Sequence, residues 1–373
     1  MMSPLIREIR RVYHTAHITL MIYPRAIHLA ETCPYINELI LNYRQSADWS
    51  NIQSFFMWNV ECAKKLLNRH FDICFAPAFY LDTAFLMYMS GAKTRISNEW
   101  MGQPFFQDVG YDVEAMKYMK KLLVYTANSR TYGLHNVDGY LSLLDHTLHS
   151  PVANREIEVW ITKEDVQLAN STLKGVSKPI YALCMGGSER MKHYPPEKYA
   201  KLIEMILNEE PTSTFIILGG GQIDLQSAEI FKSTLDKKFL DRIIDLTNKL
   251  NCRQSAAALI NCAMYIGNDT GGTMLGGAAV KCPVLATNCY SADLPEKEQG
   301  VLTGCAPYHT PSVIVLPEHA LPECAVNEPY NEYGCRVMFP HCITQIAPET
   351  IFKGFHLLKE RIAKKIIEPL YIY

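Results

Sequence analysis

The 373-residue sequence lacks the features that mark several large classes of protein. It has no apolar run approaching the ~18 residues of a membrane-spanning helix, so we expect no transmembrane segment. It has no run of basic residues, and its 36 Lys and Arg nearly balance its 38 Asp and Glu, which argues against a nucleic-acid partner. Hydrophobic residues make up 48% of the chain and charged residues 20%, which excludes a disordered or coiled-coil protein.

The short motifs of four common enzyme classes are also missing. The sequence contains no G-x-G-x-x-G dinucleotide fingerprint and no G-x-x-x-x-G-K-S/T phosphate loop. It contains no H-E-x-x-H zinc motif and no G-x-S-x-G nucleophile motif. A nicotinamide dehydrogenase, a P-loop NTPase, a zincin and a serine hydrolase are therefore disfavoured.

The 12 cysteines are scattered along the chain. Several lie in apolar strand or helix contexts, which is typical of reduced thiols and predicts a cytoplasmic protein. Four of them occupy an irregular segment together with His309 and His341, but the C-x-x-C pair of a zinc knuckle is missing. We expect loop thiols there, with a metal site or a disulfide staple as the alternative. These four are Cys305, Cys324, Cys335 and Cys342.

Helical and strand-like patterns alternate along the chain, which predicts parallel sheets covered by helices. A polar stretch at 162–178, after a strand-like run at 156–162, is the candidate crossover between two halves. We therefore predict an α/β protein with two Rossmann-like, doubly wound domains, at 1–162 and 179–346, and a C-terminal helix within 347–373. The expected strands are 18–23, 71–75, 94–97, 180–185, 214–218, 243–246, 264–267 and 284–287, and the expected helices are 52–68, 80–90, 113–127, 137–148, 197–207, 225–235, 253–262, 272–280 and 348–366.

Glycine-rich, polar segments follow three of the expected strands in the second half. Because the carboxyl ends of parallel strands meet at one edge of a sheet, we expect these segments to lie together. Glycines let backbone N–H groups approach a ligand and helix N-termini carry partial positive charge, so the combination favours phosphate, with Lys192 adding a full charge beside a diphosphate. One such loop alone would indicate a tight turn, whereas three at one edge predict a nucleotide-phosphate site. The segments are Met185–Lys192, Gly219–Gln222 and Asn268–Gly272.

The stretch Tyr265–Ala286, YIGNDTGGTMLGGAAVKCPVLA, resembles the signature of glycosyltransferase family 9, the ADP-heptose:lipopolysaccharide heptosyltransferases, in which a strand ends in N-D-T-G-x-x-H-L-A-A. RMKHYPPEKYAKLIEMI at Arg190–Ile206 resembles the family's K-x-W-P stretch, and IILGGGQID resembles its second glycine loop. SPLIREIRRVY, CPYINELI, SGAKTRIS and HNVDGYLSLL also have counterparts, so the resemblance extends over nearly the whole chain.

The resemblance implies a GT-B fold, with two Rossmann-like domains facing across a cleft. In such proteins the second domain binds the nucleotide-sugar donor, the first binds the acceptor, and the last helix packs back towards the first domain. The implied function is inverting transfer of a heptose-type sugar from ADP-heptose to a lipopolysaccharide-core or related glycan or glycolipid, with no cofactor and no metal. Peripheral association with the inner face of the cytoplasmic membrane is compatible with such an acceptor, although the basic patch Lys359–Lys365 is more typical of a solvated helix face.

The resemblance also implies roles for residues at matching positions. Lys192 would stabilise the leaving diphosphate and is the candidate catalytic residue, because the departing phosphates need positive charge. Gly187 and Ser188 would meet the donor phosphates, and Gln222 would lie on the nucleoside side. The remaining donor-binding candidates follow the fourth strand of this half and are Asp269, Thr270, Gly271, Gly272 and Met274.

Two departures from the family pattern leave the substrate and the activity open. Met274 puts an apolar thioether where the signature has a hydrogen-bonding His, which weakens the prediction of the donor. The family's expected base is an Asp in a Gly-Asp loop after a first strand, directly before the segment matched by Met1–Pro4. We expect the natural start to lie upstream, because a sheet without a central strand would expose unpaired edges. The alternatives are a non-catalytic nucleotide-sugar-binding homologue that lacks the base, and a GT-B-shaped sugar epimerase.

Overall fold

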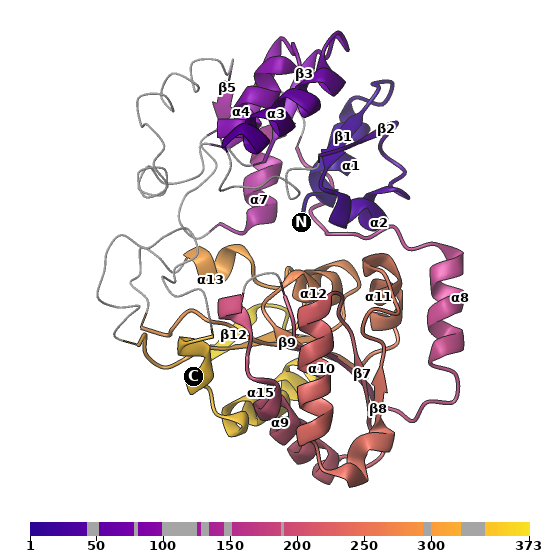
Figure 1. Cartoon of the computed structure of the whole chain (residues 1–373), viewed down its shortest axis with the longest axis vertical. Helices are drawn as coiled ribbons and strands as arrows, with labels where there is room; N and C mark the ends of the chain where they lie inside the picture. The colour runs from indigo at the N-terminus through magenta and orange to yellow at the C-terminus, as the bar shows by residue number, and fades with distance from the viewer. Residues whose placement is uncertain are drawn as a thin grey trace. The chain divides into compact units, whose positions relative to one another are not determined.

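The chain divides into two compact units, Met1–Arg155 and Glu156–Tyr373 (Figure 1). Among the described helices, none is long and apolar enough to cross a membrane. The computed structural model describes residues 1–42, 52–77, 81–98, 125–127, 134–144, 151–187, 190–293, 300–321 and 340–373.

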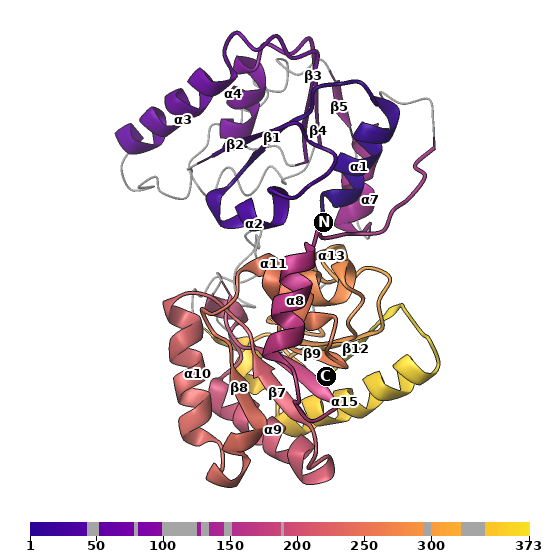
Figure 2. The same cartoon turned by 90° about the vertical axis from the view of Figure 1, so that its right-hand side faces the viewer.

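The C-terminal unit is built on one sheet of seven parallel strands in the order β12-β11-β10-β9-β6-β7-β8. Four of these strands, β7, β8, β9 and β12, are labelled in Figures 1 and 2. β9 and β7 flank β6, so the chain winds outward from β6 in both directions, and the predicted α/β doubly wound sheet is confirmed for this unit. The central strands are buried along nearly their whole length, because helices cover both faces. The strands are β6 Ile180–Cys184, β7 Thr214–Ile217, β8 Ile243–Asp245, β9 Met264–Asn268, β10 Val284–Thr287, β11 Ser312–Val315 and β12 Pro369–Ile372.

Alternate residues of the strands enter two cores, one on each face of this sheet. Tyr181 and Leu183 of β6 pack in the core that α9, α10 and α15 cover. Ile180 and Ala182 point to the other face and pack in the core that α8 and α11 cover. The helices are α8 Lys163–Thr172, α9 Pro196–Glu209, α10 Gln222–Thr234, α11 Cys252–Leu259, α12 Gly271–Thr273, α13 Gly300–Gly304 and α15 Pro348–Ala363, with the 3₁₀ turns η4 Arg190–Lys192, η5 Lys237–Arg242 and η8 Cys342–Gln345 and the π-helical turn η6 Met274–Ala279.

The segment predicted as the crossover forms a helix of the C-terminal unit, α8. Thr162 caps this helix: its hydroxyl oxygen accepts from the Asp165 N–H at 3.2 Å, and the Asp165 carboxylate accepts from the Thr162 N–H at 2.9 Å. Arg253 of α11 donates to the same carboxylate at 2.5 Å, which fastens α8 to the unit. The strand predicted at 156–162 does not form, because no neighbouring strand pairs with these described residues.

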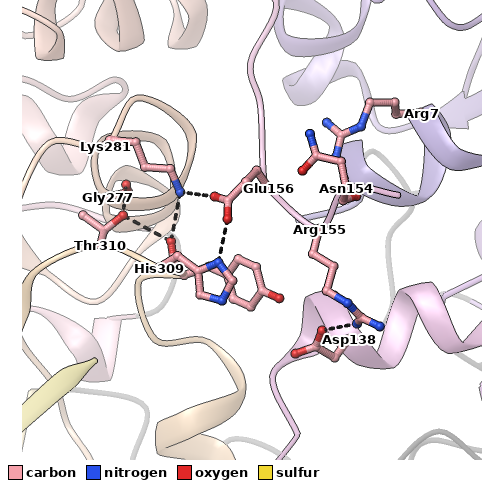
Figure 3. Close-up of polar contacts among 10 residues, drawn as sticks. Arg7, Asp138, Asn154, Arg155, Glu156, Gly277, Lys281, His309 and Thr310 are labelled. Atoms are coloured by element: carbon pink, nitrogen blue, oxygen red, sulfur yellow. Dashed lines mark hydrogen bonds and ion pairs between the residues drawn. The ribbon is translucent and has the colours of Figure 1, made fainter. Parts of the chain in front are cut away.

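The chain passes from one unit to the other between Arg155 and Glu156. Arg155 pairs with Asp138 at 2.6 Å within the N-terminal unit, whereas Glu156 accepts from Lys281 at 2.5 Å and from His309 at 2.6 Å within the C-terminal unit (Figure 3). Burial opposes ionisation of Glu156, but these hydrogen bonds and positive charges outweigh it and hold the pKa of the carboxyl below its usual value. Consecutive residues are therefore anchored in different units, with no linker between them.

The last helix, α15, packs on the sheet of its own unit. α15 lies against β10, β11 and α9, and it buries Ile351, Phe355 and Leu358. Gly354 permits this close packing, because a Cβ there would lie 2.9 Å from the Leu285 side chain. The chain then adds β12 beside β11. The apolar face of α15 is thus buried against the sheet that the helix covers.

The described strands of the N-terminal unit form two separate parallel sheets, β1-β2 and β3-β4-β5 (Figure 2). Trp58 of α3 and Leu86 of α4 pack with Ile40 of β2 in a small core. Residues 125–127, predicted as a helix end, form β5 instead because they pair with β4, while 113–124 and 145–148 of the expected helices lie outside the described residues. The elements are β1 Thr19–Ile22, β2 Glu38–Leu41, β3 Ile73–Ala76, β4 Thr94–Asn98, β5 Tyr125–Ala127, α1 Ser3–Val12, α2 Ile27–Ala30, α3 Ile52–Leu66, α4 Leu81–Met89 and α7 Asn136–Leu141, with the turns η1 Pro24–Ala26 and η3 Ser142–Leu144.

Candidate functional site

The carboxyl ends of three neighbouring strands share one edge of the C-terminal sheet. β9, β6 and β7 lie side by side and pair in parallel, so the segments that follow them leave the sheet at the same edge. These are the three glycine-rich segments of the sequence, and the fold brings them together. Ligands of open parallel sheets bind at this kind of edge, beside the strand from which the chain winds in both directions.

We number the loops in chain order: the first follows β6, the second follows β7 and the third follows β9. The first and third loops touch each other. Gly187 has a φ of +154°, and a Cβ there would lie 2.6 Å from the Thr270 methyl group, so only glycine fits this position without rearrangement. His193 donates from Nε2 to the Gly187 carbonyl at 2.9 Å, and this hydrogen bond helps to hold the first loop in place. Gly187 and Thr270, both expected in the donor site, thus lie in contact.

Lys192 and Asp269 form an ion pair at this edge. Their Nζ and Oδ2 atoms are 3.7 Å apart, and the two side chains are only 20% and 15% exposed. Asn288 donates to the same carboxylate oxygen at 3.1 Å, so Asp269 is held from a second direction. Water and salt screen partly buried charges less than exposed ones, so the Lys192 ammonium group can attract an anionic ligand here, although Asp269 offsets part of its charge.

A buried amide ties the third loop to the first. The Asn268 side-chain oxygen accepts from the Tyr199 hydroxyl at 2.9 Å and from the Tyr194 N–H at 3.1 Å. Its amide nitrogen donates to the carbonyl of Met185, where the first loop begins. The sequence placed Asn268 in a loop without giving it a role. The signal that could have identified it is a polar residue at the end of a fully buried strand, where it must find partners.

The two glycines of the third loop have different surroundings. A Cβ on Gly272 would lie 2.7 Å from the Tyr265 hydroxyl, so Gly272 packs against the core. Gly271 has no atom within 4 Å of such a Cβ and is exposed. Within the loop, Thr273 accepts from the Thr270 N–H at 2.8 Å, and the Thr270 hydroxyl accepts from the Gly272 N–H at 3.3 Å. Gly271 is therefore the outward-facing position of this loop.

The second loop brings a carboxylate that was not singled out from the sequence. Gln222 is exposed and begins α10, and Asp224 follows in the first turn. The Asp224 carboxylate accepts from the Gly220 N–H at 3.1 Å. Burial raises the pKa of this carboxyl, although hydrogen bonds from Gly220 and Gly186 and the nearby His193 oppose the effect. The signal that could have identified Asp224 is an acidic residue in the first turn of a helix that follows a glycine loop.

Two of the expected donor contacts lie outside this description. Ser188 is outside the described residues, and so is the side chain of Met274, whose backbone begins η6. In the part of the chain that is described, no three His, Cys, Asp or Glu residues form a group that could hold a metal ion. Among the described residues, neither Cys305 nor Cys342 forms a disulfide, and the other two cysteines of the irregular segment, Cys324 and Cys335, are outside the described residues.

Three solved structures resemble this chain over nearly its whole length. A glycosyl transferase family 9 protein from Veillonella parvula has a TM-score of 0.69 at 17% identity, covering 96% of this chain and 92% of that one. ADP-heptose LPS heptosyltransferase II of Escherichia coli has a TM-score of 0.63 at 14% identity, covering 97% and 95%. E. coli heptosyltransferase WaaC with ADP has a TM-score of 0.62 at 11% identity, covering 97% and 94%. The chain thus has the GT-B fold of these enzymes.

No curated protein sequence matches the chain. A family model does: that of glycosyltransferase family 9 (heptosyltransferase) matches residues 60–297, well over half of the sequence. The matched region contains Lys192, Asp269 and all three glycine-rich loops. The chain therefore belongs to glycosyltransferase family 9.

Proposed function

We propose that this protein is an inverting glycosyltransferase that moves a heptose-type sugar from an ADP-activated donor to a lipopolysaccharide-core or related glycan. The observation that carries the proposal is the Lys192–Asp269 pair beside three glycine-rich loops at one sheet edge, inside the region that matches the family. The donor class has support from two of the similar structures, one of an ADP-heptose heptosyltransferase and one with ADP. In this proposal the C-terminal unit binds the donor and the N-terminal unit binds the acceptor.

The loops would divide the donor between them. Lys192, with the backbone of the first loop at Gly187 and of the third loop at Gly271, would face the diphosphate, because Gly271 leaves its backbone uncovered and Lys192 supplies the charge. Thr270 and Gly272 would complete the third loop against the donor sugar and phosphates. Gln222, exposed at the start of α10, would lie on the nucleoside side.

The reaction is a single displacement at the anomeric carbon. An acceptor hydroxyl oxygen attacks this carbon from the side opposite the nucleotide, and the bond from the carbon to the β-phosphate oxygen breaks with inversion. The hydroxyl proton passes to a general base, and the electron pair leaves with the nucleoside diphosphate. Lys192 stabilises the charge that grows on the leaving phosphate, while Asp269 holds the ammonium group at the edge before the donor binds.

Transfer assays with ADP-heptose and a lipopolysaccharide-core acceptor test this proposal. We expect Lys192→Ala to lower kcat by about 10²-fold or more, since it removes charge that acts mainly in the transition state. Lys201→Ala is the matched control, because Lys201 is an exposed lysine of α9. Asp269→Asn, compared with Asp241→Asn at a 73% exposed position, tests the carboxylate of the pair.

The products separate the competing functions. Formation of a glycosylated acceptor that depends on Lys192 supports the proposal. Conversion of the donor in the absence of acceptor would point to an epimerase, and donor binding without any turnover would point to a nucleotide-sugar-binding homologue. Unchanged transfer in both Lys192→Ala and Asp269→Asn would rule out this edge as the site of reaction.

A further inference from the structure

The second loop of the site edge is already engaged by the protein's own side chains. The Gly220 N–H donates to Asp224 at 3.1 Å, and the Gly221 N–H donates to Asn248 at 2.6 Å. In a phosphate-binding loop, backbone N–H groups of this kind would be the donors that meet the anion. Here two consecutive glycine N–H groups at the start of α10 are bound to side-chain oxygens, one of them a carboxylate.

The Asp224 carboxyl group lies in the space left by two glycines. A Cβ built on Gly186 would be 1.8 Å from Asp224 Oδ1, and one built on Gly219 would be 2.5 Å from the same atom. Gly186 belongs to the loop after β6 and Gly219 to the loop after β7, so the carboxylate is wedged between the first and second loops. Gly186 adds a backbone hydrogen bond to that of Gly220. Asp224 therefore sits where an anion bridging these loops would bind.

The charged groups differ between the two sides of the edge. The side of the first and third loops holds Lys192 together with its partner Asp269. The side of the first and second loops holds the half-buried Asp224 carboxyl group, with His193 nearby. A diphosphate could pair with Lys192 on the first side, whereas on the second it would meet the Asp224 carboxylate, and repulsion there is strong because the carboxylate is partly shielded from water.

We propose that Asp224 is a specificity-determining residue that occupies the anion position between the first two loops. The donor's diphosphate is thereby confined to the Lys192 side, and the second loop receives an uncharged, hydroxyl-bearing part of the donor, its nucleoside. This inference rests on the proposed function, since it places the parts of a nucleotide-sugar on the same edge. It assigns Asp224 a role that is distinct from holding the fold.

Calorimetric titration of the full chain with inorganic pyrophosphate, ADP and adenosine tests this role. Asp224→Asn keeps a carbonyl oxygen for the Gly220 N–H and removes the charge. We expect it to tighten pyrophosphate and ADP binding by about fivefold or more and to change adenosine binding by less than about twofold. Asp224→Ser, which retains a hydroxyl acceptor in the first helical turn, is the second variant if the first does not fold. Asp241→Asn, the same charge change at an exposed position, is the control.

The outcomes are distinguishable. A gain for the two anionic ligands alone, seen in an Asp224 variant and not in Asp241→Asn, supports the inference. Equal changes for all three ligands indicate a structural role and overturn it, as does weaker anion binding, which would mean that Asp224 orients the groups that hold the phosphates. If the wild-type protein binds none of the three ligands, the proposed function fails and the inference fails with it.

Discussion

The two units of the chain differ in how they are held together and in what they contribute to the site. The C-terminal unit has one sheet of seven strands with a core on each face, and one edge of that sheet gathers three loops and the Lys192–Asp269 pair. The described strands of the N-terminal unit form two smaller sheets, and residues of β2, α3 and α4 pack together in one cluster of this unit. The donor half of the proposed reaction is thus assigned to short loops that follow buried strands of the C-terminal unit.

Truncation of one isoleucine in each unit would test this contrast most strongly. Ile203 of α9 is fully buried in the large core, and Ile40 of β2 is 5% exposed in the small one. We expect Ile203→Ala to lower the free energy of unfolding by about 3–4 kcal/mol, and Ile40→Ala by about half as much because its surroundings can collapse. Denaturant titration with unit-resolved hydrogen exchange measures both. Equal losses would mean that the two cores are equally well packed.

The assignment of α8 to the C-terminal unit depends on Asp165, which is 3% exposed and pairs with Arg253. Asp165→Ala removes the carboxylate half of the capping box and leaves the largely buried Arg253 guanidinium without this carboxylate, so we expect a loss of about 3 kcal/mol. Glu164→Ala, at the exposed neighbouring position, should change stability by less than about 0.5 kcal/mol. Exchange protection should fall in α8 and α11 and stay constant in the N-terminal unit. Loss of protection in both units instead would contradict the division of the chain at Arg155.

Two glycines of the site edge offer a matched pair of substitutions. Gly187→Ala introduces a methyl group 2.6 Å from the Thr270 side chain at a positive φ, so we expect a loss of about 1–2 kcal/mol and weaker ADP binding. Gly271→Ala meets no atom within 4 Å and should leave stability nearly unchanged. Thermal unfolding and ADP titration distinguish them. A harmless Gly187→Ala would show that the first and third loops are not in contact.

We expect the smallest effect on stability from a substitution at the boundary between the units. Glu156 is 43% exposed, so its contacts with Lys281 and His309 contribute about 0.5–1 kcal/mol after screening by solvent. Because the folded protein lowers the pKa of Glu156, this contribution is present above the unfolded pKa of about 4.3 and is lost as the pH falls through the lower, folded value. Glu156→Gln should remove that part of the pH dependence in unfolding experiments. An unchanged pH profile would show that the contacts add nothing to stability.

Short apolar runs in the sequence predicted β1, β3, β4 and β6 to β10, and glycine-rich loops follow β6, β7 and β9. The sequence missed β11 and β12, because Ser312–Val315 lies within an irregular stretch and Pro369–Ile372 becomes a strand only by pairing with β11. Their structure comes from partners that are distant in the sequence.

The same limit applies to the site. Glycine loops and Lys192 could be predicted because each is recognisable within a few residues of a strand end. The roles of Asn268 and Asp224 could not, because Asn268 reaches Tyr199, 69 residues away in sequence, and Asp224 fills space at Gly186. The Lys192–Asp269 pair likewise joins two loops through the order of β6 and β9 in the sheet.

The central claim is that this sheet edge holds the donor diphosphate, and calorimetric titration with ADP, UDP and GDP tests it most directly. The wild-type protein, Lys192→Ala and Lys201→Ala are titrated side by side. We expect that ADP binds selectively, that Lys192→Ala weakens ADP binding by about tenfold, and that Lys201→Ala leaves it unchanged. Equal ADP affinity in the wild-type protein and in Lys192→Ala, or no ADP binding at all, would contradict the claim that this sheet edge holds the donor diphosphate.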